Sequence, residues 1–443
     1  MSPLAPTLTG LQQALKKGLL SPSESIGAQR ARLQHLDDRF GCVVTAFDAT
    51  DWPEQTRSDG ALAGVGLAHK DIFDLPCRAP GLGHDRGSRD AHRRPAPALD
   101  RLHRRGASHL AALTMAEYAC GATGRNPRFK PCINPINAKA VVGGSSSGSA
   151  VAVSSEMAYG SLGTDTAGSV RIPAATCGLL GLKTTHGLLP TEGVHPLAAS
   201  LDGVGLLTRS AADAQVLLLA LHPALRESHL ASMPPRVKAW LPEAQLHPDI
   251  ERALGQFAND CRATERLTQL PEHAVLTGLA EIVLHHEAAL THEAALLACS
   301  LSATVEAVAL PGLAVPLAWY EAAIAARSQH AKAFFAAHLK DHDVLLLPAL
   351  PRPVPDWDSV DADSPSFKVR ELLALHQFMG FVNYLGFPSV VIPVTHDERG
   401  MPISVQLIGR PHQELTLLAL AHTMELQRFG SSGFTRHFSH LKD

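Results

Sequence analysis

A stretch rich in glycine and serine, residues 141–190, constrains this chain more than any other feature of its sequence. It contains two short apolar runs, residues 150–153 and 178–182, which a flexible linker would lack. Glycine adopts backbone conformations that other residues resist, and loops on a rigid scaffold often carry catalytic groups. We therefore expect a tight, turn-rich site here, packed inside a folded domain.

The composition is that of an ordinary globular protein, with 45% hydrophobic and 18% charged residues among 443. This balance excludes disordered and collagen-like chains. Thirty-nine basic residues against 42 acidic ones give a net charge of −3, without any block of five like charges. Nucleic acid is therefore not an expected partner.

Membrane insertion and secretion are not expected either. No apolar run reaches the roughly 18 to 20 residues of a membrane span, and the N-terminus lacks the pattern of a signal peptide. The seven cysteines are scattered and never form a CxxC pair, which favours reduced thiols over disulfides or zinc ligands. These features predict a cytoplasmic protein.

The first part of the chain predicts two short helices and a strand. Capping-box patterns at residues 9–12 and 21–24 each begin a helix. The small apolar run at residues 62–70 reads as a strand that ends at a lysine, and a helix is expected around residues 99–106.

The second part of the chain alternates between helical and strand patterns. Residues 210–345 are rich in alanine and leucine with helical periodicity, including 211–221 and 319–338. Residues 388–394 and 402–409 predict two buried strands, with a turn over 397–400, and a final helix is expected at 414–427.

A histidine-based metal site finds little support in the sequence. His286 and His292 are six residues apart, whereas a zinc-binding helix places two histidines four apart on one face. We expect these histidines on a solvated helix face. No metal and no cofactor are predicted.

A conventional serine hydrolase is a second reading. Residues 144–148 satisfy G-x-S-x-G, which would make Ser146 a nucleophile with a histidine base. The preceding residues 137–142 are only weakly apolar, however, whereas this motif follows a buried strand. We therefore keep Ser146 as an alternative only.

Two long motifs identify a family. Residues 143–150 read GGSSSGSA, and residues 163–173 read GTDTAGSVRIP. Both resemble the signature of the amidase signature family, and Lys70 in the segment 68–72 resembles that family's upstream lysine motif. The resemblance extends to residues 178–183, 343–348, 383–388 and 400–409. It covers nearly the full chain, in the right order.

The resemblance implies an α/β fold, with one mixed, twisted β-sheet surrounded by helices in a single domain spanning residues 1–443. The signature core would span about 62–210. A helical region at about 211–345 would shape the substrate pocket, and strands with a final helix would follow at about 346–443.

The resemblance also assigns a catalytic Ser-cisSer-Lys triad. Ser169 would be the nucleophile, and Ser145, whose peptide bond is cis in the family, would relay protons between Ser169 and Lys70. A serine hydroxyl needs a base to attack a carbonyl, and burial can keep a lysine neutral enough to serve. Ser–Lys arrangements are a known variant of triad catalysis.

The remaining site residues follow from the same two motifs. Backbone N–H groups of the nucleophile turn would form the oxyanion hole, with Ala167 where many relatives carry glycine. These are Thr166, Ala167, Gly168 and Ser169. Asp165 and Arg171 could pair to hold the turn, and Gly143 and Gly144 would give the cis-serine loop its space.

Two further residues near the motifs are not expected to act in catalysis. Neighbouring side chains of a strand point to opposite faces, so His69 should not face the site together with Lys70. Cys177 is expected to be a buried small residue.

These features predict an amidohydrolase that cleaves a small, neutral, fairly apolar amide through a Ser169 acyl-enzyme. One rival is the A-type component of a glutamine-dependent amidotransferase. Such components usually carry glutamine where this chain has the apolar Ile172. Urethane- or urea-type amides on the same site, and a non-catalytic binding protein, are further alternatives. A homo-oligomer is compatible with the sequence, whereas a protein partner is not required.

Overall fold

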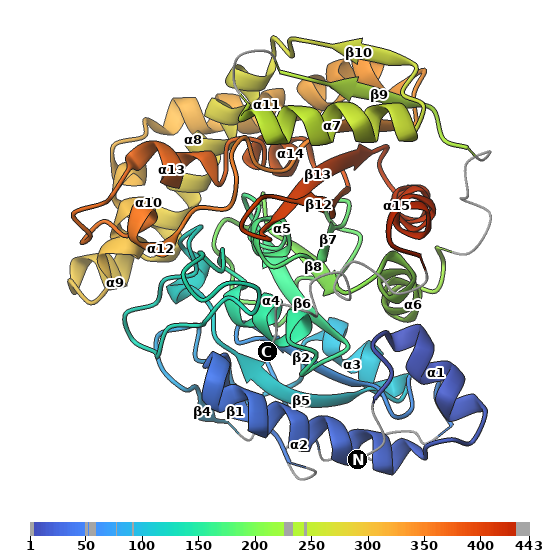
Figure 1. Cartoon of the computed structure of the whole chain (residues 1–443). Coiled ribbons are helices and arrows are strands. Elements are labelled where there is room, and N and C mark those ends of the chain that lie inside the picture. Colours follow the sequence, from blue (N-terminus) through green and yellow to red (C-terminus); the bar gives the residue numbers. More distant parts are fainter. Residues whose placement is uncertain are drawn as a thin grey trace.

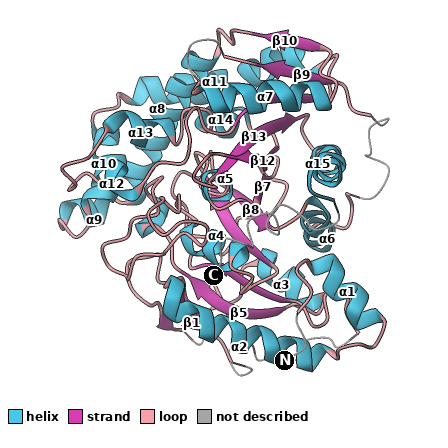
Figure 2. Cartoon of the chain, viewed as in Figure 1, coloured by secondary structure: helices cyan, strands magenta, loops and turns pink. Residues whose placement is uncertain are grey.

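An eight-stranded mixed sheet runs through the centre of the molecule (Figures 1 and 2). The computed structural model describes residues 4–48, 52, 59–76, 78–90, 93–225, 234–242 and 246–430. In spatial order the strands are β10 (Glu265–Leu267), β9 (Val237–Trp240), β11 (Val344–Pro348), β13 (Pro402–Gly409), β12 (Ser389–His396), β7 (Leu180–Lys183), β8 (Gly203–Thr208) and β6 (Gly160–Asp165). Pairing is parallel from β10 through β9 to β11 and antiparallel from there to β6. The expected mixed sheet is confirmed.

A second, three-stranded sheet lies beside the first and carries Lys70. Its order is β1 (Val43–Ala46), β5 (Ser108–Leu113), β2 (Gly66–Lys70), and β2 pairs in parallel with β5. A two-stranded ribbon joins β3 (Arg78–Ala79) and β4 (Ser88–Arg89). Lys70 is thus the last residue of an edge strand, as the sequence predicted.

Helices surround both sheets (Figure 1). They are α1 (Leu8–Lys16), α2 (Pro22–Phe40), α3 (Pro97–Arg104), α4 (Ser147–Ser154), α5 (Arg171–Thr176), α6 (Ala211–Leu221), α7 (Pro248–Asp260), α8 (His273–Thr291), α9 (Glu293–Leu297), α10 (Ala303–Leu313), α11 (Leu317–Phe334), α12 (Trp357–Val360), α13 (Val369–Ala374), α14 (Gly380–Leu385) and α15 (Glu414–Phe429), with short turns η1 (Glu117–Ala119) and η3 (Phe335–Leu339). Helices α6 and α15 pack together on one side of the large sheet, and α8, α10, α11 and α14 pack together elsewhere.

Several predicted elements are confirmed with their caps. The capping box of Ser21 with Glu24 begins α2, which runs for 19 residues and is therefore not short. Helix α6 matches its predicted range, and β12 and β13 form the predicted antiparallel pair. Helix α1 begins earlier than predicted, because Thr7 rather than Thr9 accepts the capping hydrogen bond, from the Gly10 N–H.

The prediction that residues 210–345 are helical is wrong where the chain forms strands β9 and β10. They extend the large sheet at its far edge, where β9 pairs with both β10 and β11. Strand β9 has only four residues and includes Lys238, whose amine reaches the Ala337 carbonyl oxygen and Glu265. Because so short a segment carries a charge, its apolar pattern is too weak to predict a strand.

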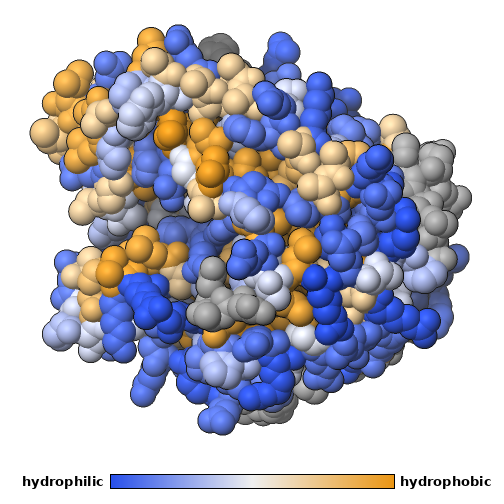
Figure 3. All heavy atoms as spheres, turned by 90° about the horizontal axis from the view of Figure 1, so that it is seen from above, coloured by the Kyte–Doolittle hydropathy of each residue, from blue (hydrophilic) through white to orange (hydrophobic). Residues whose placement is uncertain are grey.

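Apolar side chains are exposed where α8, α9, α10 and α11 meet. Figure 3 shows apolar surface on this side of the molecule, at the left. The exposed residues there are Leu290, Leu297, Leu310, Leu313, Leu317 and Trp319. No individual helix of the described chain has both the length and the apolar character to cross a bilayer.

Candidate active site

The two serine loops of the signature meet at the centre of the molecule. Ser145 lies in the loop before α4, and Ser169 lies on the turn between β6 and α5. The Ser146 N–H donates to the Ser169 carbonyl oxygen at 3.2 Å, which ties one loop to the other. The Gly144–Ser145 peptide bond is cis, as the resemblance implies. The Ala116 N–H donates to the Ser145 carbonyl oxygen at 3.0 Å.

Two glycines are required by these loops. A Cβ atom on Gly144 would lie 2.5 Å from the Gly121 carbonyl oxygen, so the backbone itself leaves no room for a side chain. Gly168 has a φ of +109°, and a Cβ there would lie 2.7 Å from the Cβ of Met379. Both positions therefore need the freedom and small size of glycine.

Lys70 contacts Ser145 directly. Its Nζ donates to Ser145 Oγ and to Thr164 Oγ1, each at 2.7 Å. The side chain is only 1% exposed. Burial lowers the pKa of Lys70 to about 7, although the carboxylates of Asp202 and Asp165 oppose the shift. A large fraction of this amine is therefore neutral at neutral pH and able to accept a proton.

Ser169 is the most exposed of the three expected catalytic residues. It is 9% exposed, whereas Ser145 is fully buried and Lys70 nearly so. In the part of the chain that the structure describes, no side chain or backbone group hydrogen-bonds its hydroxyl. Of the three residues, Ser169 is therefore the one most open to solvent, whereas Lys70 bonds the buried Ser145.

Asp165 and Arg171 form a fully buried ion pair beneath the nucleophile turn. Arg171 Nε donates to Asp165 Oδ2 at 3.0 Å, and a terminal nitrogen donates to Oδ1 at 2.9 Å. Burial raises the pKa of a carboxyl group, but the guanidinium outweighs this effect and holds the pKa of Asp165 well below its usual range. The pairing expected from the sequence is present.

The same carboxylate holds the turn through its backbone. Asp165 accepts from the N–H groups of Gly168 at 2.9 Å, Val170 at 3.2 Å and Arg171 at 3.3 Å. The Gly168 amide is therefore already engaged, which corrects its expected place in an oxyanion hole. The amides of Thr166, Ala167 and Ser169 have no such acceptor among the described residues.

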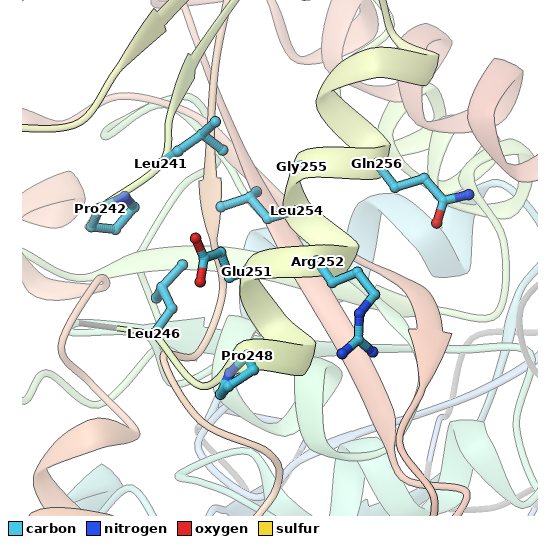
Figure 4. A pocket seen from close by; sticks show the side chains of 9 residues that line it. All are labelled: Leu241, Pro242, Leu246, Pro248, Glu251, Arg252, Leu254, Gly255 and Gln256. Atoms are coloured by element: carbon cyan, nitrogen blue, oxygen red, sulfur yellow. The ribbon is translucent and has the colours of Figure 1, made fainter. Parts of the chain in front are cut away.

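A surface pocket of about 400 Å³ lies apart from these residues. It is lined by Leu241, Pro242, Leu246, Pro248, Glu251, Arg252, Leu254, Gly255 and Gln256 (Figure 4). Helix α7 and the segment before it form its walls, and none of the signature residues lines it. The pocket is therefore not the site described above.

Comparison with known proteins assigns the family. The model of the amidase family matches residues 24–251 and 308–418, more than half of the chain. The protein belongs to the amidase family. It is an enzyme that hydrolyses amide bonds.

Relatives of this amidase cover almost its whole length. The A-type component of the glutamyl-tRNA(Gln) amidotransferase of Exiguobacterium sibiricum is 26% identical, over 95% of this chain and 97% of that protein. A crystal structure of an amidase superposes with a TM-score of 0.82 at 29% identity, over 95% of this chain and 100% of the other. The allophanate hydrolase of Kluyveromyces lactis shares the fold, with a TM-score of 0.81 at 23% identity, over 96% of this chain and 73% of the other.

Sequence reasoning missed four polar residues that support the amidase signature loops. They are Thr164, Asp202, Asn383 and Gln406. Asn383 Nδ2 donates to Asp165 Oδ1 at 2.9 Å, and Gln406 Oε1 accepts from Arg171 at 2.6 Å. Both are polar residues among apolar neighbours, within segments that resemble the family. This contrast is a sequence signal that could have identified them.

Asp202 lies in the loop directly before β8, the strand that pairs with β6. Its Oδ1 accepts from Thr166 Oγ1 at 2.5 Å, and its Oδ2 accepts from the N–H groups of Leu197 and Ala198. Burial raises the pKa of Asp202 to about 6. No feature of the sequence distinguishes it from other aspartates, because its side-chain partner Thr166 lies 36 residues away in the chain.

The side chains of the other sequence candidates do not hydrogen-bond Lys70, Ser145 or Ser169 in the described chain. Ser146 is fully buried, and its hydroxyl lacks a hydrogen-bond partner among the described residues. His69 bonds away from the serines, as expected. Cys177 is buried, with its Sγ 3.5 Å from the Val142 carbonyl oxygen.

His292 corrects the expectation of a solvated helix face. It is 4% exposed, because its ring packs against the rings of Tyr118, at a centroid distance of 4.9 Å, and His195, at 6.3 Å. The described residues contain no group of three or more side chains suited to hold a metal ion.

The buried ion pair of Asp165 and Arg171 should contribute to the stability of the fold. Arg171→Ala should lower the free energy of unfolding by about 3 to 5 kcal/mol, because Asp165 would remain a buried charge without its partner. Urea unfolding followed by circular dichroism measures this. Arg104→Ala is the matched control, since the Arg104 side chain is 70% exposed in its pair with Asp100; it should cost less than about 1 kcal/mol. Equal losses in the two variants would contradict the account.

Proposed function

We propose that this amidase cleaves its substrate through an acyl-enzyme on Ser169, with Ser145 as proton relay and Lys70 as base. The observation that carries the proposal is the 2.7 Å contact between the buried Lys70 amine and the Ser145 hydroxyl. No charged group other than Lys70 bonds Ser145 in the described chain. A neutral amine at this position can take a proton from Ser145 while Ser145 takes one from Ser169.

The first half-reaction forms the acyl-enzyme. Ser169 Oγ attacks the amide carbon and passes its proton to Ser145, which passes one to Lys70. The tetrahedral intermediate collapses by breaking the C–N bond. The leaving amine receives a proton back from Lys70 through Ser145, so charge and protons balance.

The second half-reaction restores the enzyme. A water molecule attacks the ester carbon of acyl-Ser169, and the same relay removes a proton from that water. Collapse breaks the bond to Ser169 Oγ, and the relay returns a proton to it. The products are an amine or ammonia and a carboxylic acid.

Backbone amides of the nucleophile turn would stabilise the negative charge on the carbonyl oxygen. Thr166, Ala167 and Ser169 are the donors we propose, because the Gly168 amide bonds Asp165. Asp165 and Arg171 contribute indirectly, by holding the turn in one conformation. Preorganised donors of this kind are each worth about 10²- to 10³-fold in rate.

The substrate we propose is a small, neutral and fairly apolar amide. Small apolar residues border the nucleophile turn: a Cβ on Gly380 would lie 3.6 Å from the Cβ of Ala280 and 4.0 Å from that of Ala167. Burial raises the pKa of the Cys120 thiol, near Lys70, to about 12, which keeps that thiol neutral. A zwitterionic substrate would be left partly unpaired beside such groups, at a cost of several kcal/mol.

The proposed substrate class does not rest on Ile172. It is 1% exposed and packs in an apolar cluster with Met379, behind the turn. The A-type component of an amidotransferase remains the second candidate, because relatives with that name align over almost the whole chain. Urethane- and urea-type amides are accommodated by the same chemistry.

A substrate panel tests this proposal. Initial rates are compared for aliphatic amides, aryl amides, carbamates and glutamine, with ammonia release as the readout for glutamine. We expect the best neutral amide to be cleaved about 100-fold faster than glutamine or more. Glutamine hydrolysis at a matching rate, or co-purification with a B-type amidotransferase component, would favour the second candidate instead.

A further inference from the structure

Two sheet edges meet beside Lys70. Strand β2 is the edge of the small sheet and β6 is the edge of the large one, and no backbone ladder joins them in the described chain. Three single hydrogen bonds cross between the two segments. In order along both, they join the Tyr159 N–H to the Gly66 carbonyl oxygen at 3.1 Å, the Leu162 N–H to His69 Nδ1 at 3.1 Å, and Lys70 Nζ to Thr164 Oγ1 at 2.7 Å.

The hydrogen bonds of His69 determine its tautomer. Because Nδ1 accepts from the Leu162 N–H, the ring proton lies on Nε2. That N–H donates to His109 Nδ1 at 2.8 Å. His109 is in turn stacked against the Trp52 ring at a centroid distance of 4.2 Å. His69 is therefore held on both sides, by β6 through one nitrogen and by β5 through the other.

Burial supports this neutral state. His69 is 3% exposed and His109 is 6% exposed. Burial lowers the pKa of His69 to about 3 and that of His109 well below its usual value. Both rings therefore remain neutral throughout the pH range in which Lys70 titrates, and Nδ1 of His69 remains an acceptor.

The position of Lys70 relative to β6 needs an anchor other than Lys70 itself. The Lys70 amine must exchange protons with Ser145 in each half-reaction. The charge of the donor in its hydrogen bond to Thr164 therefore changes during turnover. The bond from Tyr159 to Gly66 lies at the far end of β2, four residues away. Among the hydrogen bonds of the described residues, only the one between Leu162 and His69 crosses next to Lys70 without involving the amine.

We infer that His69 is a positioning residue, whose Nδ1 clamps β2 to β6 and so holds the Lys70 amine against Ser145 Oγ. This inference rests on the proposed role of Lys70 as base. His69 touches neither serine and takes no proton during the reaction. A misplacement of about 1 Å can cost about 10²-fold in rate, which sets the scale of its effect.

Three substitutions at His69 distinguish the contributions of its two ring nitrogens. His69→Asn keeps an acceptor where Nδ1 lies and loses the contact with His109. His69→Gln reaches the position of Nε2 but gives up the acceptor for Leu162, and His69→Leu gives up both. For each variant we would measure kcat, KM, the pH profile of kcat/KM and the midpoint of thermal unfolding, with rates per active site from the burst of leaving group.

We expect His69→Asn to keep kcat within about 3-fold of the parent enzyme, and His69→Gln and His69→Leu to lose about 10- to 100-fold with KM unchanged. In these last two variants the acid limb of the pH profile should move to higher pH. A loosened strand admits water to Lys70, and weaker desolvation raises its pKa. His338→Gln, at a buried histidine bonded to Glu272, is the control and should change stability without moving the limb.

Wild-type kcat and pH profile in His69→Gln would overturn the inference, and so would equal losses in the Asn and Gln variants. If His69→Leu does not fold, the comparison of Asn with Gln still decides. Failure of the proposed function is distinguishable, because it would appear as full activity in Lys70→Ala whatever the His69 variants do.

Discussion

Ser169→Ala should abolish amide hydrolysis, with a loss of kcat of about 10⁴-fold or more. Without Ser169 Oγ no covalent intermediate forms, and the relay of Ser145 and Lys70 has no nucleophile to activate. The substitution removes one atom from a residue whose hydroxyl has no partner in the described structure, so the fold should be unchanged. Steady-state kinetics with the best amide of the panel measures the loss, and thermal unfolding checks the fold.

Ser146→Ala is the matched control for that experiment. Ser146 neighbours Ser145 and is fully buried, but its hydroxyl bonds neither Lys70 nor any other described group. We expect this variant to retain much of the wild-type activity. An inactive Ser146→Ala together with an active Ser169→Ala would show that the G-x-S-x-G reading was right and the family assignment of the nucleophile wrong.

The second large effect concerns Lys70. Lys70→Ala should lower kcat/KM by about 10³-fold, because Ser145 Oγ and Thr164 Oγ1 would lose their shared donor and the relay its base. In the parent enzyme, kcat/KM should rise about tenfold per pH unit below pH 7 and level off above it. The sign follows from the pKa of Lys70, about 7, since only the deprotonated amine accepts a proton.

A full pH series on both enzymes measures this effect. The residual activity of Lys70→Ala should lack the acid limb near pH 7. An acid limb at the same pH in both enzymes would mean that another group causes the limb. The clearest other candidate is Lys183. Burial lowers the pKa of that lysine to about 7 as well, but its amine bonds the backbone carbonyl oxygens of Thr184 and Phe387.

Local patterns predicted the elements that depend on local interactions. The side chains of Ser21 and Glu24 each accept a hydrogen bond from the other residue's backbone N–H, within one turn. The start of this helix can therefore be predicted without tertiary information. Helix α6 and the β12–β13 pair are likewise long, regular and apolar. The pattern at Thr9 predicts a cap that the structure does not have, because the Thr9 hydroxyl donates to Asp213, 204 residues away in the chain.

The site was predictable only in part. The motifs predict Lys70, Ser145 and Ser169 as catalytic residues, and the charges of Asp165 and Arg171 make their observed pairing foreseeable. The engagement of the Gly168 amide was not, because it depends on how the turn folds back onto Asp165. The prediction for His292 took the outer face of the helix to be in contact with solvent. In the structure, a loop that carries His195 covers the His292 ring.

The central claim is tested most directly by locating the acyl group on the enzyme. The protein is mixed with 4-nitrophenyl butyrate, quenched in acid within the burst phase, and analysed by intact mass and peptide mapping. We predict one butyryl group on Ser169, absent from Ser169→Ala and present in Ser146→Ala. A butyryl group on Ser146 or Cys120 with Ser169 unmodified, or labelling that persists in Ser169→Ala, would contradict the account.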